Sequence, residues 1–142
     1  MGATENKKSA HRLVLEGVSA GNMAVVDELM APNVVEHDLP PGLPQNREGF
    51  KMFFTGFRAA FPDLKYTIEE ELADGDKVMH RLMGTGTMKG DFQGMKATNK
   101  TATWQEMHIG RFDASGKIVE HWGTVDMLGM LTQLGLMPQH GG

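Results

Sequence analysis

The residues best suited to chemistry stand at alternate positions in two segments of the second half of the chain. A β-strand points successive side chains to opposite faces, so residues two positions apart share a face. One face of the first segment carries Trp104, Glu106, His108 and Phe112. One face of the second carries Ile118, Glu120, Trp122, Thr124 and Asp126. If both faces border one cavity, two tryptophans, a histidine and a carboxylate converge there. An apolar pocket with a few converging polar groups is the usual form of a small-molecule site.

Asp126 is the predicted acid–base residue of this site. Beside Trp122 and other apolar side chains it would be partly desolvated, and desolvation raises the pKa of a carboxyl toward the range useful for proton transfer. The alternative is a structural role as the N-cap of the following helix, because aspartate is a favoured N-cap residue. His108 is the predicted helper, and its alternative is a histidine that simply packs in the core.

His37 is a second candidate helper because it precedes the proline-rich segment 40–44, which could act as a lid. The alternative is a plain histidine at the edge of a loop. No metal site is expected, because Glu36 and Asp38 on a strand would point away from His37 and no recognised ligand spacing occurs. No cofactor is expected either. The chain has no cysteine, no Gly-x-Ser-x-Gly motif and no phosphate-binding glycine loop.

The length of the chain predicts one domain over residues 1–142, ordered from about 5 to 137. The 14 basic and 18 acidic residues give a net charge of −4. No basic run indicates a nucleic-acid partner. No apolar stretch approaches the ~20 residues of a membrane helix, and the polar N-terminus lacks the apolar core of a secretory signal. We therefore expect a cytoplasmic protein that binds neither nucleic acid nor membranes.

Helices are predicted mainly in the first half of the chain. The first starts near Thr4 and ends at Gly21, and Asn22 can cap a second helix over 23–30. The third, over 47–60, places phenylalanines along one face at helical spacing. They are Phe50, Phe53, Phe54, Phe57 and Phe61.

After residue 64 the period of the apolar residues changes from 3.6 to 2, which indicates strands. Strands are predicted over 64–72, 77–88, 98–113 and 117–126, with a short strand at 34–38 and a final helix near 128–134. Helices separated from a run of antiparallel strands are typical of the α+β class. The predicted architecture is therefore helices packed on a curved antiparallel sheet.

Motifs along most of the chain resemble the SnoaL-like polyketide cyclases. They are Glu36-His37-Asp38 before Pro40-Pro41-Gly42, Arg47-Glu48-Gly49-Phe50, Ala60-Phe61-Pro62-Asp63, Gly116-Lys117-Ile118-Val119-Glu120-His121-Trp122 and Leu131-Thr132-Gln133-Leu134-Gly135. The resemblance runs from about Glu5 to Gly135. It implies the cone-shaped fold shared with nuclear transport factor 2 (NTF2) and ketosteroid isomerase, with a pocket between helices and sheet.

The resemblance also implies an activity, which is ring closure of a polyketide by intramolecular aldol condensation without cofactor or metal. An aspartate assisted by histidines would transfer the protons, and these roles fall on Asp126, His108 and His37. The substrate would be a small apolar ketone or ester. Its expected contacts are Trp104, Glu106, Trp122, Phe50, Phe54 and Phe57. Homodimers or homotetramers built through the sheet are implied as well.

Two other functions stay open from the sequence. The 12 methionines and the phenylalanine row suit a protein that only binds a hydrophobic small molecule, because methionine lines adaptable pockets. The second open function is that of a related hydrolase or isomerase with the same fold. An epoxide or lactone hydrolase would need an Asp–Arg–Asp network in the cavity. Arg81 and Arg111 are the only strand arginines, and alternation places Arg111 opposite Trp104 and His108.

Overall fold

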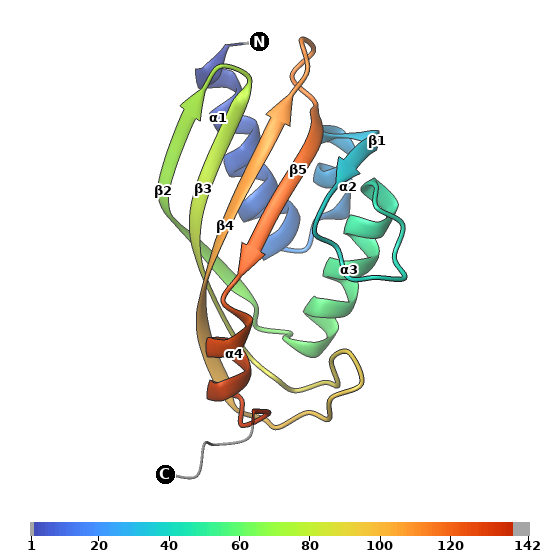
Figure 1. Ribbon diagram of the computed structural model, residues 1–142, viewed down its shortest axis with the longest axis vertical. Coiled ribbons are helices and arrows are strands. Elements are labelled where there is room, and N and C mark those ends of the chain that lie inside the picture. Colours follow the sequence, from blue (N-terminus) through green and yellow to red (C-terminus); the bar gives the residue numbers. More distant parts are fainter. Residues whose placement is uncertain (1, 138–142) are drawn as a thin grey trace.

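The computed structural model describes residues 2–137, which form a five-stranded sheet with helices packed against one face (Figure 1). The elements are, in order, α1 (Ala3–Arg12), the π-helical segment η1 (Leu13–Ser19), α2 (Met23–Leu29), β1 (Met30–Glu36), α3 (Arg47–Ala60), β2 (Lys65–Asp74), β3 (Lys77–Thr87), β4 (Thr101–Phe112), β5 (Ile118–Val125) and α4 (Met127–Gln133). This confirms the predicted α+β class. No helix among residues 2–137 combines the length and apolar character needed to cross a membrane.

The strands lie in the order β1-β5-β4-β3-β2. The neighbours from β2 to β5 are antiparallel, as predicted from their hairpin succession, but β1 runs parallel to β5. The sheet is therefore mixed rather than wholly antiparallel. Pro32 falls in the register shift between Met30 and Val35, where its missing N–H breaks no regular ladder bond.

The helix boundaries follow the predicted capping residues in most places. Gly21 has a φ of +79°, the left-handed conformation that ends a helix, and the Asn22 side chain accepts a hydrogen bond from Ala24 N at 3.1 Å. At the chain start, Gly2 rather than Thr4 precedes the helix, and no side chain caps it. The π-helical winding of η1 has no signal in the sequence pattern.

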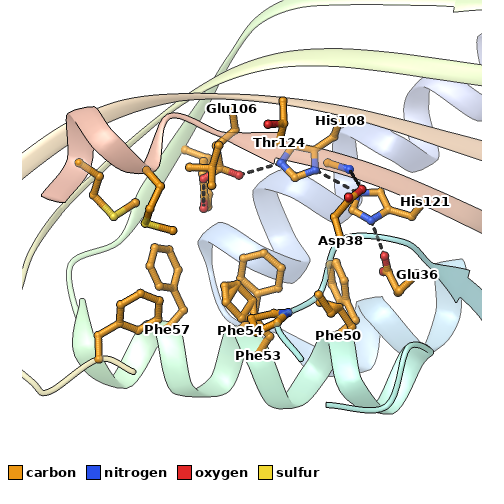
Figure 2. Close-up of a pocket in the computed structure, with 18 residues that line it drawn as sticks. Glu36, Asp38, Phe50, Phe53, Phe54, Phe57, Glu106, His108, His121 and Thr124 are labelled. Atoms are coloured by element: carbon orange, nitrogen blue, oxygen red, sulfur yellow. Dashed lines mark hydrogen bonds and ion pairs between the residues drawn. The ribbon is translucent and has the colours of Figure 1, made fainter. Parts of the chain in front are cut away.

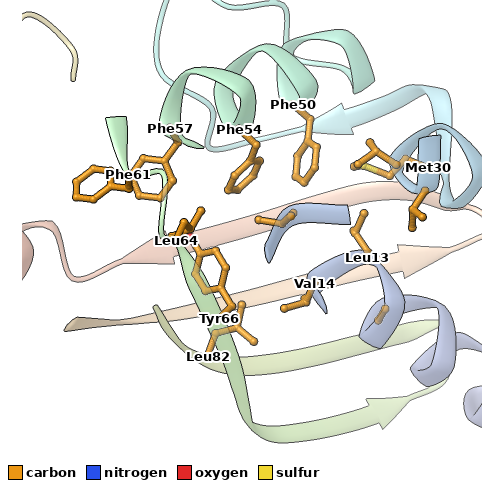
Figure 3. Packing of buried hydrophobic residues seen from close by; sticks show 14 of the residues in the cluster. Leu13, Val14, Met30, Phe50, Phe54, Phe57, Phe61, Leu64, Tyr66 and Leu82 are labelled. Atoms are coloured by element: carbon orange, nitrogen blue, oxygen red, sulfur yellow. The ribbon is translucent and has the colours of Figure 1, made fainter. Parts of the chain in front are cut away.

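The core lies between α3, η1 and the inner face of the sheet (Figure 3). Phe50, Phe54 and Phe57 point from α3 toward the strands and are at most 7% exposed. Tyr66 on β2 and Trp104 on β4 meet them from the sheet, and both are buried. The predicted phenylalanine row thus forms one wall of the molecule's interior, opposite the strands that carry the polar residues.

Candidate active site

The inner face of β4 carries the polar residues that alternation predicts. Trp104 is 1% exposed, Glu106 is 7% exposed and His108 is partly buried. Glu106 and His108 point toward the helices (Figure 2), and the Trp104 ring contacts Phe57 of α3. His108 lies opposite Gly123 of β5 in the antiparallel register. Strand β4 therefore supplies a tryptophan, a carboxylate and an imidazole to one side of the sheet, as expected from their spacing.

On β5 the prediction that Ile118 shares one face of the strand with Glu120 and Trp122 is wrong. Phe112 pairs with Ile118 while Arg111 pairs with Glu120, so Val119 is an extra residue in β5. Such a β-bulge exchanges the two faces of the strand after it. Glu120 and Trp122 consequently lie on the outer face of the sheet. The residues that turn inward instead are His121, Gly123 and Val125.

Glu106 is the centre of the buried polar group. Its Oε2 accepts hydrogen bonds from Tyr66 Oη at 2.6 Å and Trp104 Nε1 at 2.7 Å, and its Oε1 lies 2.7 Å from His108 Nε2. Burial raises the pKa of the Glu106 carboxyl, but the bond to His108, the charge of that histidine and the two other donors outweigh burial and lower it. Glu106 is therefore an ionised acceptor that holds three donors in place.

His108 continues this group through a second histidine to a second carboxylate. Its Nδ1 lies 3.0 Å from His121 Nε2, and His121 Nδ1 lies 2.6 Å from Glu36 Oε2. Each of these contacts, like the one to Glu106, needs one hydrogen between its two atoms. Three hydrogens thus bridge two carboxylates and two imidazoles. Both nitrogens of His108 are used inside the protein.

A cavity of about 100 Å³ separates this polar group from the phenylalanine row (Figure 2). Its lining is Glu36, Asp38, Leu39, Pro40, Phe50, Phe53, Phe54, Phe57, Tyr66, Phe92, Glu106, His108, His121, Gly123, Thr124, Val125, Met127 and Met130. Asp38, in the loop after β1, lies beside His108 and His121. Its Oδ2 accepts a hydrogen bond from Gly123 N at 2.8 Å, and its Oδ1 has no hydrogen bond to the described residues.

Two predicted catalytic residues lie outside this lining. Asp126 is exposed, and its Oδ1 accepts a hydrogen bond from Gly129 N at 2.9 Å, so it caps α4 as the structural alternative expected. His37 lies on the outer face, where its ring stacks on Trp122 with centroids 5.1 Å apart and its Nε2 lies 2.7 Å from Glu120 Oε2. The catalytic roles assigned to Asp126 and His37 stay predictions.

Some of the other residues predicted to contact the substrate line the cavity, and others do not. Phe50, Phe54, Phe57, Glu106 and His108 line the cavity. Trp104 lies behind Glu106 and contributes its ring N–H, and Trp122 faces away. Arg81 and Arg111 bind Glu70 and Glu120 and do not line the cavity, so they give no support to an Asp–Arg–Asp hydrolase network.

Sequence reasoning missed four polar residues of the site, which are Glu36, Asp38, Tyr66 and His121. Glu36 and Asp38 alternate with His37, and the alternation that argues against a shared metal site also places these two carboxylates together on the inner side. His121 was hidden by the bulge at Val119. Within residues 2–137, no group of three or more metal-binding side chains is placed to hold an ion.

Comparisons with known proteins agree with this architecture. The family model of the SnoaL-like polyketide cyclases matches residues 8–134. A structure assigned as a polyketide cyclase from Bacillus cereus shares 32% identity, with a TM-score of 0.82 over 96% of this chain and 84% of its own. IdmH from Streptomyces antibioticus shares 32% identity, with a TM-score of 0.79 over 92% of this chain and 98% of its own.

TsrD from Streptomyces laurentii is 20% identical, with a TM-score of 0.87 over 96% of this chain and 99% of its own, and shows the fold alone. No curated protein sequence matches the chain significantly. The match of the family model over residues 8–134 and the two structures at 32% identity confirm the resemblance seen in the motifs. With an NTF2-like fold and a cavity between phenylalanines and ionisable side chains, the chain belongs to the SnoaL-like polyketide cyclase family.

Proposed function

We propose that the protein is a cofactor-independent cyclase that closes a ring in a small apolar polyketide by intramolecular aldol condensation. The observation that carries this proposal is the cavity with two unlike walls, phenylalanines of α3 on one side and Glu106, His108 and His121 on the other. The apolar wall suits a flat, hydrophobic substrate. The polar wall suits the proton transfers that enolate chemistry needs.

Asp38 is the best-placed base of this cavity. Glu106 already accepts three hydrogen bonds, and its lowered pKa makes it a weaker proton acceptor. Asp38 is oriented by one bond from Gly123 N, while its Oδ1 is open. A general base must reach the proton it removes with a free lone pair. Asp38 meets this requirement at the cavity wall, whereas Asp126, which also accepts a single hydrogen bond, does not line the cavity.

The reaction needs only proton transfers around one carbon–carbon bond. Asp38 takes a proton from a carbon between two carbonyls, and the electron pair of that C–H bond forms an enolate. The enolate carbon attacks an internal ketone carbon and forms the new bond. The ketone oxygen becomes an alkoxide, which takes the proton back from Asp38. Tyr66 and His108 line the same wall, but each already shares its hydrogen with Glu106, so either would have to change partner to donate to the developing oxyanion.

Replacing Asp38 with asparagine is expected to reduce cyclisation by about 10²–10⁴-fold, the usual contribution of a positioned acid–base group. The substrates would be a panel of poly-β-ketone methyl esters, with cyclised products quantified by liquid chromatography and mass spectrometry. Asp126→Asn is the matched control. Asparagine caps helices about as well as aspartate, so this variant should stay folded and active.

Each outcome of this experiment decides between assignments. If Asp126→Asn loses turnover and Asp38→Asn keeps it, the base is Asp126 and α4 must move to reach the substrate. If the wild type binds members of the panel but converts none of them, the cavity serves binding rather than catalysis. Thermal unfolding of both variants has to match the wild type before either result is interpreted.

The outer face of the sheet suits a second copy of the chain. Leu72, Met79, Ile109 and Trp122 are direct neighbours across four strands, and we call this row the outer ladder. Leu72 is 55% exposed, and helices α1 to α3 cover the opposite face. Apolar residues gathered on an uncovered face commonly mark an interface, and a twofold dimer would pair the outer ladder with itself. We infer a homodimer built through this face.

Ile109→Lys should convert this dimer to a monomer, because it places a charge at the centre of the outer ladder. Molar mass measured by light scattering after size-exclusion chromatography would show the change. Thr67→Lys adds the same charge to the same face, on β2 away from the outer ladder, and should leave the dimer intact. A wild type that is monomeric at all concentrations would refute the inference.

A further inference from the structure

A second chamber of about 60 Å³, which we call the inner chamber, lies between the sheet and the N-terminal helices. It shares with the main cavity the residues Phe50, Phe54, Tyr66, Glu106, His108 and His121. Its remaining lining is Ala10, Leu13, Val14, Val18, Val78, His80, Leu82, Gly110, Phe112 and Ile118. The two chambers therefore adjoin at the polar group. Apart from that shared wall, His80 is the one side chain of this lining with hydrogen-bonding atoms.

His80 lines the chamber, and one of its two ring nitrogens has no hydrogen bond within the described protein. The residue is 4% exposed on β3, and its Nε2 lies 2.8 Å from Glu71 Oε2. An ionised carboxylate only accepts hydrogen bonds, so Nε2 carries the hydrogen of this contact. Nδ1 has no hydrogen-bond partner among the described residues. Because the ring as a whole is buried, a donor from a molecule in the chamber can give Nδ1 the hydrogen bond that the described protein groups do not.

The protonation state of His80 determines what Nδ1 can bind. Burial lowers the pKa of His80 below its usual value of 6.5, and it outweighs the opposing effect of Glu71. A positive charge on His108 or His11 would act in the same direction as burial. The ring is therefore neutral near pH 7, with its hydrogen on Nε2. Nδ1 is then a hydrogen-bond acceptor and calls for an O–H or N–H donor.

We propose that the inner chamber is a second subsite that binds an apolar arm of the ligand ending in a hydroxyl group, whose hydrogen is donated to His80 Nδ1. This proposal deepens the proposed function, because it rests on the use of the main cavity as a ligand site. It does not depend on catalysis or on Asp38.

The volume of the chamber limits the length of this arm. A water-sized group needs roughly 10–15 Å³ on this measure, so 60 Å³ admits about four to six non-hydrogen atoms. A short hydroxyalkyl chain fits this limit and a fused ring system exceeds it. The bulkier, flat part of the ligand would remain in the main cavity against Phe53 and Phe57, which do not line the inner chamber.

The test compares 4-phenylbutan-1-ol with pentylbenzene, which has a methyl group in place of the hydroxyl. Dissociation constants would be measured by intrinsic tryptophan fluorescence, with the wild type, His80→Phe and His11→Phe. The wild type should bind the alcohol about tenfold more tightly, because only the alcohol satisfies Nδ1. His80→Phe should remove this preference. His11→Phe should keep it, because His11 contacts the same Glu71 from the exposed side and does not line the chamber.

Equal affinity of the wild type for both probes, or a preference that survives in His80→Phe, would overturn the proposal. If His80→Phe does not fold, the ¹⁵N chemical shift of His80 Nδ1 in the wild type gives the same answer. It should change with the alcohol and not with the hydrocarbon, and a shift caused equally by both would also overturn the proposal. Neither probe contains a carbonyl, so the failure of the cyclase proposal would leave this result unaffected.

Discussion

Replacing Glu106 with alanine is expected to lower the free energy of unfolding by about 3–5 kcal/mol, the usual effect of removing one member of a buried charged network. The variant leaves Tyr66 Oη, Trp104 Nε1 and His108 Nε2 without their acceptor inside the protein. Tyr66 and Trp104 are almost fully buried, so water cannot easily replace the lost carboxylate. Urea unfolding followed by circular dichroism would measure the loss.

Glu106→Gln is the matched control because it keeps the shape and one acceptor oxygen. That oxygen can still receive the bonds from Tyr66 and Trp104, while the amide group meets His108 as a donor. We expect this variant to lose less stability than Glu106→Ala. An alanine variant as stable as the glutamine variant would show that the three donors find other partners, and that Glu106 does not organise the site.

The stabilisation by Glu106 should also depend on pH in a defined direction. Its carboxyl pKa is lowered by folding from 4.5, so the unfolded chain takes up this proton at a higher pH than the folded protein. The contribution is complete above about pH 4.5 and is lost as the pH falls through the lowered value. The stability difference between wild type and Glu106→Gln should therefore shrink in acid. A constant difference down to about pH 3 would contradict this assignment.

The order of helices and strands could be predicted because each was encoded locally. Four phenylalanines recur at helical spacing within α3 and a fifth, Phe61, directly follows it, and the change to alternation after residue 64 marks the sheet. The inner face of β4 was also readable, because a regular strand keeps its alternation from Trp104 to His108. These features depend on neighbours within a few residues, so one sequence is enough to reveal them.

The rest of the site depends on pairings between distant segments. Val119 shifts the alternation of β5 by one residue, and nothing in the local pattern shows a bulge there. Glu36 meets His121 because β1 pairs in parallel with β5, a contact across 85 residues. Asp38 reaches Gly123 by the same pairing. The candidate base and the second histidine therefore could not be placed from the sequence, although the types of residue needed were identified.

The position of the loop that carries Asp38 depends on Gly49 of α3. This glycine belongs to the motif Arg47-Glu48-Gly49-Phe50, but the motif alone does not show why a glycine is needed there. A Cβ added at Gly49 would lie 1.6 Å from the Pro44 carbonyl oxygen and 2.7 Å from its carbon. These are backbone atoms, so no rotation of a side chain can relieve the contact. The segment they belong to is tied to β1, because Glu36 N donates a hydrogen bond to Gln45 O at 3.1 Å.

Gly49→Ala is therefore expected to cost about 3 kcal/mol or more of stability, at the upper end for an overpacked site, and to displace the loop with Asp38. Gly56→Ala is the matched control in the same helix. A Cβ there meets nothing within 4 Å, so alanine should stabilise α3 by about 0.5–1 kcal/mol. Urea unfolding of the two variants should give opposite signs. If Gly49→Ala were as stable and as active as Gly56→Ala, segment 39–46 would not be packed against α3 in solution, and the placement of Asp38 at the cavity wall would lose its support.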